Sequence, residues 1–319
     1  MKWIKNTGKF ILKISIILLV TLSILELSYR YQWIDYYSFE WEYQNPKTET
    51  KPSSEKILVF GDSFSAEPNS WVNQLKKDSN NFLIFNASIP GVGPETFNLL
   101  MNERIDEVDP DKVIIQLYVG NDLYDIKKPV NWSEFSINRN LFWTFSNRFR
   151  VLNFFNYRMG QVSYDIIDTV DVKTSKAFDS KFYSTRTKLF IHGDNHYPQN
   201  VISLSQRKLD EFNRLIVYLK KMEETSTVPV YVVIIPHCAQ VHTFYRDCYL
   251  ELGADIQSEL SKSNKWSIHL SQNGFNVIDP LFYFRELEKN GERLYFENDP
   301  HLTELGQKEL ARFIIKYFE

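Results

Sequence analysis

The sequence predicts a three-layer α/β/α sandwich with a parallel β-sheet, preceded by an N-terminal transmembrane helix. Two observations support this prediction. Short apolar runs rich in β-branched residues alternate with segments of helical periodicity, which is typical of strand–helix–strand units around a parallel sheet. In addition, an apolar stretch of about one bilayer thickness lies near the N-terminus. Of the 319 residues, 43% are hydrophobic and 24% are charged, so a sizeable core is feasible.

Residues 1–30 differ from the rest of the chain and are predicted to be a membrane anchor. Residues 10–27 are apolar, with no acid before Glu26, and as a helix they would extend about 27 Å. The lysines that precede or enter this stretch predict an extracytoplasmic location for the rest of the chain. They are Lys2, Lys5, Lys9 and Lys13. A cleaved signal peptide and a buried soluble helix are the alternatives, although no small-x-small cleavage pattern occurs near Leu25.

Residues 31–55 are predicted to be a juxtamembrane linker. The part from Tyr43 to Ser54 is polar and contains Pro46 and Pro52. Aromatic side chains, which suit a membrane interface, are frequent where the linker begins. They are Tyr29, Trp33, Tyr36, Tyr37, Phe39 and Trp41.

Residues 56–319 are predicted to form the α/β domain. Continuous apolar runs predict strands that are buried on both faces, at residues 57–60, 82–86, 112–119, 228–236 and 275–278. Amphipathic patterns predict helices between them, at residues 71–78, 95–108, 204–224, 249–261 and 303–318.

Residues 123–203 are too long for a connection within a compact domain and are predicted to be an insertion. The first part of the insertion is rich in aromatic residues, at Trp132, Phe135, Phe142, Trp143, Phe145, Phe149, Phe154, Phe155 and Tyr157. One interpretation is a small satellite core that packs the insertion against the domain. The other is a lid or an acceptor-binding wall, because the insertion begins beside the candidate site.

Polar residues follow the predicted strands at their carboxyl ends, which is where parallel α/β sheets bind ligands. Ser63 stands at the turn after the first strand, and the loop after the second contains Gly91. Asn121 follows the third strand, and Asp299 and His301 precede the last helix. A serine hydroxyl needs an imidazole to accept its proton, and the imidazole needs a carboxylate to orient it. The backbone N–H groups of Ser63 and Gly91 and the amide of Asn121 could form an oxyanion hole.

These residues resemble, in order, the four sequence blocks of the SGNH (GDSL-type) hydrolase superfamily. The blocks are Gly61-Asp62-Ser63, the loop from Asn86 to Gly91, Gly120-Asn121-Asp122 and Asp299-x-His301, and the resemblance covers residue 56 to the C-terminus apart from the insertion. It implies a flavodoxin-like three-layer fold and ester or thioester substrates. It also implies Ser63 as the nucleophile, Gly91 and Asn121 in the oxyanion hole, and His301 as the general base.

One departure concerns the carboxylate. The commonest pattern of the superfamily is Asp-x-x-His, but here Asn298 occupies the position three before His301. A membrane-anchored branch that acts on cell-envelope polysaccharides looks similar in having Asp-x-His, so Asp299 is interpreted as the carboxylate. A Ser63–His301 dyad is the alternative. Asp62 and Asp122 are interpreted as turn or capping residues, although both match the blocks.

The remaining candidate sites are weaker. His192 and His196 have the spacing of a metal pair, but a turn sequence separates them. His237 and His242 could line the site or serve packing. Cys238 and Cys248 could form a disulfide or be unrelated core residues. No sequence motif implies a cofactor or metal, and a net charge of −3 gives no reason to expect nucleic acid.

Three functions are compatible with these observations. The first is an extracytoplasmic, membrane-anchored serine esterase, or acylhydrolase, that acts on O-acyl esters, O-acetyl in particular, of an envelope glycan or lipid. The second is an O-acyltransferase that uses the same acyl-enzyme but passes the acyl group to a polysaccharide hydroxyl. The third is a non-catalytic assembly protein that has retained the fold.

Overall fold

The computed structural model describes residues 2–46, 54–79, 81–127, 137–159, 191, 193–257, 263–297 and 299–318. Its centre is a five-stranded parallel sheet with the strand order β2-β1-β3-β4-β5. The strands are β1 (Glu55–Phe60), β2 (Phe82–Asn86), β3 (Lys112–Tyr118), β4 (Val230–Ile235) and β5 (Asn276–Ile278). This order is that of flavodoxin-like sheets, and it confirms the predicted fold class.

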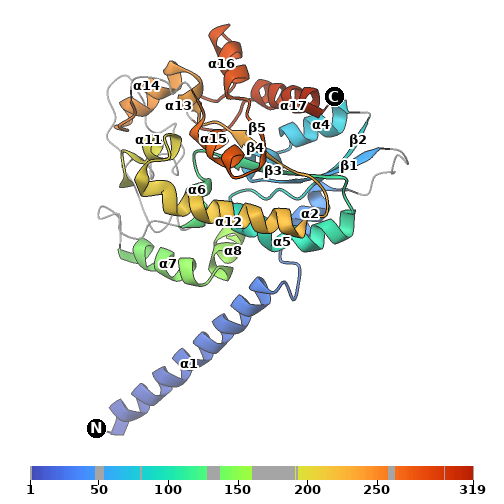
Figure 1. The fold of residues 1–319 in the computed structure, drawn as a ribbon. Coiled ribbons are helices and arrows are strands. Elements are labelled where there is room, and N and C mark those ends of the chain that lie inside the picture. Colours follow the sequence, from blue (N-terminus) through green and yellow to red (C-terminus); the bar gives the residue numbers. More distant parts are fainter. Residues whose placement is uncertain are drawn as a thin grey trace.

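Helices cover both faces of the sheet (Figure 1). On one face α5 (Pro94–Val108) packs against α12 (Leu209–Thr225), and on the other α4 (Trp71–Asp78) packs against α17 (Glu304–Phe318). The remaining elements of the domain are α3 (Ser63–Ala66), α6 (Asp122–Ile126), α11 (Tyr197–Ile202), η2 (Gln206–Lys208), α13 (Cys238–Val241), α14 (Thr243–Glu251), α15 (Lys265–Gln272) and α16 (Leu281–Lys289).

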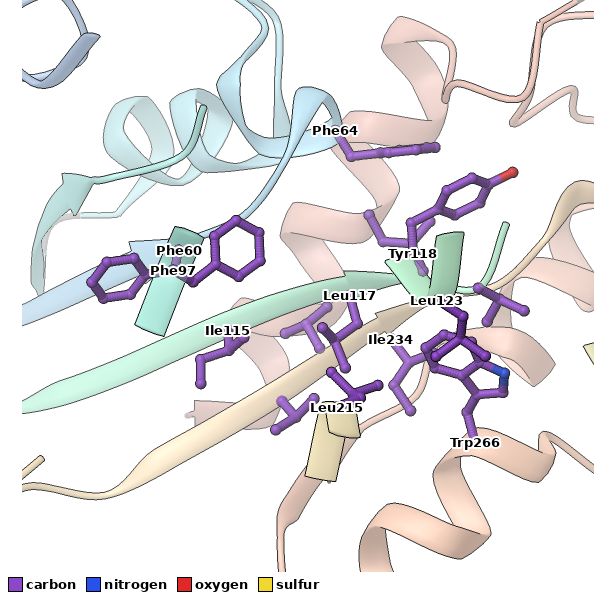
Figure 2. Packing of buried hydrophobic residues seen from close by; sticks show 14 of the residues in the cluster. Phe60, Phe64, Phe97, Ile115, Leu117, Tyr118, Leu123, Leu215, Ile234 and Trp266 are labelled. Carbon is purple, nitrogen blue, oxygen red and sulfur yellow. The ribbon is translucent and has the colours of Figure 1, made fainter. Parts of the chain in front are cut away.

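The hydrophobic core lies in two layers, one on each face of the sheet (Figure 2). Ile115, Leu117 and Ile234 come from the central strands and have no exposed surface. Because these strands are buried on both faces, their sequences are continuous apolar runs rather than alternating ones. On one face, Trp266 of α15 meets the ring of Phe212 of α12 edge to face, with the ring centroids 5.4 Å apart. Burial of each large apolar side chain contributes about 1.5–3 kcal/mol.

The predicted helix at residues 249–261 is wrong. The chain instead forms α14, which begins six residues earlier and ends at Glu251. Its start is fixed by His242, whose Nδ1 accepts a hydrogen bond from the N–H of Phe244 at 3.0 Å. Its end is followed by Gly253, whose φ of 89° is left-handed and incompatible with a continuing helix.

The apolar N-terminal segment forms one long helix, α1 (Lys2–Arg30), that projects away from the domain (Figure 1). Residues Gly8–Arg30 are long and apolar enough to cross a bilayer. The end of α1 is joined to the domain through Glu26, which is buried and accepts a hydrogen bond from the N–H of Val151 at 2.9 Å. Arg30 pairs with Glu26 and donates to the carbonyl of Arg148.

The first half of the predicted linker is folded. Residues Ser38–Gln44 form α2, and the side chains of Tyr36 and Tyr37 are buried. Pro46 is among the described residues, and Pro52 lies outside them. The segment that follows the anchor therefore packs on the domain before the chain reaches β1.

The described part of the predicted insertion contains α7 (Ile137–Arg148) and α8 (Val151–Arg158). Trp143 is buried and meets Tyr124 edge to face, with centroids 5.5 Å apart. Phe154 lies 5.0 Å from Tyr36 and 5.4 Å from Tyr37 between centroids. These contacts join α7 to α6 and α8 to the segment that follows α1. Trp132, Phe135 and residues 160–190 lie outside the described residues.

Candidate active site

The candidate nucleophile stands at the first residue of a one-turn helix directly after β1. Asp62 caps this helix, α3, because its Oδ1 accepts a hydrogen bond from the N–H of Phe64 at 3.0 Å. This cap uses a carboxyl oxygen as the acceptor, and the side chain of Asp62 has no exposed surface. Asp62 therefore fixes the turn on which Ser63 is presented, as a capping residue would.

Gly61 and Gln116 shape the underside of this turn. A Cβ atom at Gly61 would lie 2.5 Å from Gln116 Oε1, so only glycine fits there without displacing the amide. Gln116 Oε1 accepts hydrogen bonds from the N–H of Asp62 at 3.1 Å and from the hydroxyl of Ser65 at 2.9 Å. A buried amide on the neighbouring strand thus holds both sides of the turn.

Ser63, His301 and Asp299 form a continuous hydrogen-bonded chain, although Ser63 and His301 are 238 positions apart. Ser63 Oγ lies 2.8 Å from His301 Nε2. The Nδ1 atom of His301 faces Asp299 Oδ1, which also accepts from the backbone N–H of His301 at 2.9 Å. With the proton on Nδ1 donating to Asp299, Nε2 is left to accept from the Ser63 hydroxyl. Asn298 lies outside the described residues.

The carboxylate and the imidazole shift each other's pKa in opposite directions. Burial by itself would lower the pKa of His301, but the hydrogen bond and charge of Asp299 outweigh it, so this pKa is raised above 6.5. Burial would likewise raise the pKa of Asp299, but its hydrogen bonds with His301 lower it below 3.8. Glu67 adds negative charge near the imidazole, and burial raises the pKa of its own carboxyl.

The two other predicted oxyanion donors lie on loops at the same edge of the sheet. Gly91 has a φ of 72°, a left-handed conformation that favours glycine. Its loop is fastened to the nucleophile turn, because the N–H of Ile89 donates to the carbonyl of Gly61 at 3.0 Å. Asn121 is buried, and its Nδ2 makes a long hydrogen bond of 3.4 Å to Asp62. Such a weak bond leaves the amide able to turn to a better acceptor.

Asp122, the other acid of these sequence blocks, closes the loop after β3. Its Oδ2 accepts a hydrogen bond from the backbone N–H of Tyr118 at 2.7 Å, and the side chain is fully buried. The loop therefore folds back on the end of the strand, which places Asn121 at the edge of the sheet.

Aromatic rings pack behind the imidazole. The ring of Phe64 stacks on that of His301, with centroids 4.8 Å apart, and lies 4.4 Å from the ring of Tyr118. Figure 2 shows Phe64 and Tyr118 next to each other on one side of the sheet. The ring of His237 is parallel to that of Tyr118 at 6.3 Å. This packing restricts the rotation of the His301 ring without using its nitrogen atoms.

The remaining histidines and cysteines have other roles in the structure. His237 caps α13 through a hydrogen bond from the N–H of Ala239 to its Nδ1, and burial lowers its pKa to about 3. Cys238 and Cys248 are buried and are not joined by a disulfide. His192 lies outside the described residues, and no group of metal-binding side chains occurs among those that are described.

Sequence reasoning missed the residues that support the site. Gln116 interrupts the apolar run of β3. A polar side chain inside a buried strand needs a hydrogen-bond partner, and this was the signal in the sequence that could have identified it. Gln307, on α17, accepts from the N–H of Trp71 at 2.8 Å and donates to the carbonyl of Phe64 at 3.2 Å. Nothing in the pattern of α17 distinguishes Gln307 from a surface residue.

No protein-family model matches the chain, and no curated protein matches its sequence. Among solved structures, the chain is similar to a lipolytic protein of the G-D-S-L family from Veillonella parvula, at a TM-score of 0.41 and 11% identity over 83% of this chain and 98% of the other. It is also similar to the acetyl xylan esterase AlAXEase, at a TM-score of 0.40 and 12% identity over 83% and 100% of the two chains.

A third similar structure is a catalytic mutant of an acetylxylan esterase from Geobacillus stearothermophilus. Its TM-score is 0.39 and its identity 13%, over 84% of this chain and 95% of the other. These three similar structures are thus a lipolytic protein of the G-D-S-L family and two acetyl xylan esterases. Similarity at this level indicates neither the substrate nor the mechanism of this protein.

Proposed function

We propose that this protein is a serine esterase that hydrolyses O-acyl esters through an acyl-enzyme on Ser63. The observation that supports the proposal is the hydrogen-bonded chain from Ser63 through His301 to Asp299. Each member has the chemistry that its position requires. The serine supplies a nucleophilic oxygen, the imidazole accepts the proton of this oxygen, and the carboxylate stabilises the imidazolium that results.

The proposed reaction has two steps. In the first, Ser63 Oγ attacks the ester carbonyl while its proton passes to His301 Nε2, and the imidazolium then protonates the departing alcohol. In the second, His301 takes a proton from a water molecule that attacks the acyl-serine, and the carboxylic acid leaves as the Ser63 hydroxyl is restored. Ester and water are thereby converted to alcohol and acid.

The negative oxygen that forms in each step needs hydrogen-bond donors. In the proposal these are the backbone N–H groups of Ser63 and Gly91 and the side-chain amide of Asn121. Loss of a single such donor costs about 2.7–4 kcal/mol of transition-state stabilisation in other serine hydrolases. The weak bond between Asn121 and Asp62 supports this assignment, because little is lost when the amide turns to the oxyanion.

Hydrolysis is favoured over acyl transfer by the solvent exposure of the site. The side chains of His301 and Asp299 are 28% and 34% exposed. Water can therefore reach an acyl group on Ser63, whereas a transferase gains from excluding water. Transfer to a sugar hydroxyl is an outcome that the experiment below distinguishes.

The proposed substrates are O-acyl esters, O-acetyl in particular, on an envelope glycan or lipid near the bilayer. In this proposal α1 anchors the protein and the domain lies on the extracytoplasmic side. Support comes from the exposed apolar side chains along α1. A cavity of about 370 Å³ is lined both by Tyr29 and Tyr31 at the end of α1 and by Gly91 and Gly93 of the candidate oxyanion loop. The cavity therefore lies between the end of the anchor and the candidate oxyanion loop.

The test uses the full chain in detergent micelles with p-nitrophenyl acetate, in the presence and absence of an oligosaccharide. Ser63→Ala should reduce catalysed release by about 10⁴–10⁶-fold. The matched control is Ser88→Ala, since Ser88 is buried in the candidate oxyanion loop and its hydroxyl has no hydrogen-bond partner among the described residues. Release that survives Ser63→Ala would contradict the proposal, and acetylated oligosaccharide would identify a transferase instead.

A further inference from the structure

The segment between the anchor and β1 reaches the back of the nucleophile turn. Gln44, the last residue of α2, is buried with 9% of its surface exposed. Its Nε2 donates a hydrogen bond to the carbonyl of Ala66 at 2.6 Å, and its Oε1 accepts one from Nδ2 of Asn86 at 3.1 Å. One carboxamide therefore joins the end of α3 to the residue that begins the candidate oxyanion loop.

Asn86 completes this bridge. Its Nδ2 also donates to the carbonyl of Ser65 at 2.8 Å, and its side-chain oxygen accepts from the N–H of Ser88 at 3.0 Å. Helix α3 has a single turn, so the carbonyl groups of its last residues lack partners within the helix. The side-chain amide of Gln44 therefore satisfies the carbonyl of Ala66, and that of Asn86 satisfies the carbonyl of Ser65.

The end of α2 is itself held firmly. Asn45 forms two hydrogen bonds with the backbone of Asn86. The Nδ2 of Asn45 donates to the carbonyl of Asn86 at 2.9 Å, and the N–H of Asn86 donates to the Oδ1 of Asn45 at 2.8 Å. Lys76 of α4 donates to the carbonyl of Gln44 at 2.8 Å. The end of α2 thus binds the edge strand β2 and the helix α4 beside it.

We infer that Gln44 is a positioning residue, which sets the nucleophile turn at the correct place relative to the candidate oxyanion loop. The catalytic part of this inference rests on the proposed function. The physical coupling between the nucleophile turn and the candidate oxyanion loop does not depend on it. Gln44 touches neither Ser63 nor a substrate. It acts through the carbonyl of Ala66 and through Asn86, and so couples the juxtamembrane segment to the geometry of the site.

The expected effect is on turnover rather than on substrate binding. A displacement of about 1 Å between a nucleophile and its oxyanion donors can reduce the rate by about a hundredfold. Gln44→Met keeps the length of the side chain but removes both hydrogen bonds. We therefore expect kcat for p-nitrophenyl acetate to fall about ten- to a hundredfold, with KM changed by less than about twofold.

Gln44→Glu keeps an acceptor for Asn86 but replaces the donor to Ala66 by a carboxylate oxygen, which the carbonyl of Ala66 repels. We expect a fall in kcat at least as large as that of Gln44→Met. The matched control is Gln74→Met, since Gln74 is equally buried, but its Nε2 makes one long bond of 3.4 Å, to Asn69, away from the turn. This control should retain the kcat of the original protein.

The experiment uses the full chain in detergent and follows two quantities, kcat with KM and amide hydrogen exchange by mass spectrometry. We expect Gln44→Met to speed exchange in peptides that cover residues 61–67 and 86–93, with no change in peptides from β4. Unchanged exchange in both segments would overturn the inference, whatever the activity. Faster exchange with unchanged kcat, while Ser63→Ala is inactive, would overturn the catalytic role. If release survives Ser63→Ala, the proposed function fails, and exchange alone decides whether Gln44 couples the segments.

Discussion

Replacing Asp299 by asparagine removes one negative charge from the imidazole and changes little else in shape. In the structure, Oδ1 of Asp299 faces Nδ1 of His301 and also accepts from its backbone N–H at 2.9 Å. An asparagine oxygen can keep the backbone bond. It cannot stabilise an imidazolium as a carboxylate does, and its amide can present an N–H to Nδ1, which moves the ring proton to Nε2. In that tautomer the imidazole cannot accept the Ser63 proton.

The expected loss follows from these two effects. A carboxylate-to-amide change at this position of a serine–histidine–aspartate site reduces kcat by up to about 10⁴-fold, which equals about 5.4 kcal/mol of activation free energy. The exposure of Asp299 weakens its charge through solvent screening, so we expect a loss between about 10² and 10⁴.

The pH dependence provides a second readout. His301 works as a base when neutral, so activity is present above its pKa and is lost as the pH falls through it. Asp299 helps to raise this pKa above 6.5, and its removal lowers the pKa. The acid limb of kcat/KM in Asp299→Asn should therefore move to lower pH than in the original protein, while the plateau falls.

The assay is the pH profile of kcat/KM for p-nitrophenyl acetate, with Glu67→Gln as the matched control. Glu67 also raises the pKa of His301 through its charge, but no hydrogen bond links it to the ring among the described contacts. Glu67→Gln should therefore move the acid limb to lower pH and keep a plateau within about tenfold of the original. A plateau for Asp299→Asn within about twofold of the original, or an unmoved acid limb, would refute the reasoning.

Three further predictions concern stability, each checked by thermal unfolding. Gly306→Ala would place a Cβ atom 2.2 Å from the carbonyl oxygen of Leu294, and we expect a loss of at least about 1–3 kcal/mol. Gln116→Leu would leave a backbone N–H and a serine hydroxyl of the nucleophile turn without an acceptor, for a loss of about 1–3 kcal/mol per group. Glu26→Ala removes the acceptor for the N–H of Val151, and we expect a loss of about 0.5–2 kcal/mol. An unfolding temperature equal to that of the original protein would contradict the prediction for each variant.

The strands of the domain could be predicted from the sequence because burial on both faces leaves a local trace. The apolar run at residues 112–119 corresponds to β3, Lys112–Tyr118, to within one residue. The helix expected at 249–261 shows the limit of such patterns. Its apolar spacing continues beyond Gly253, but backbone conformation there and the cap at His242 set the true bounds. Histidine is not among the usual N-capping residues, so the start was hard to recognise.

The candidate site was predictable in its residue types and not in its geometry. Ser63, Asp299 and His301 could be selected because a serine, an acid and an imidazole at strand ends suggest one chemistry. Their approach to within hydrogen-bonding distance depends on the whole sheet. Gln44 was assigned to a linker because its surroundings in the sequence are polar. Its burial results from contacts with Ala66 and other distant residues, which no local pattern encodes.

The mass of the protein during turnover shows directly whether an acyl group forms on Ser63. The full chain is mixed with p-nitrophenyl acetate, quenched in acid within the first turnovers, digested and analysed by mass spectrometry. The account predicts the mass of one added acetyl group on the peptide that contains Ser63, with the label on that serine and absent from Ser63→Ala. Turnover with no label on Ser63, or with the acetyl group on another residue, would contradict it.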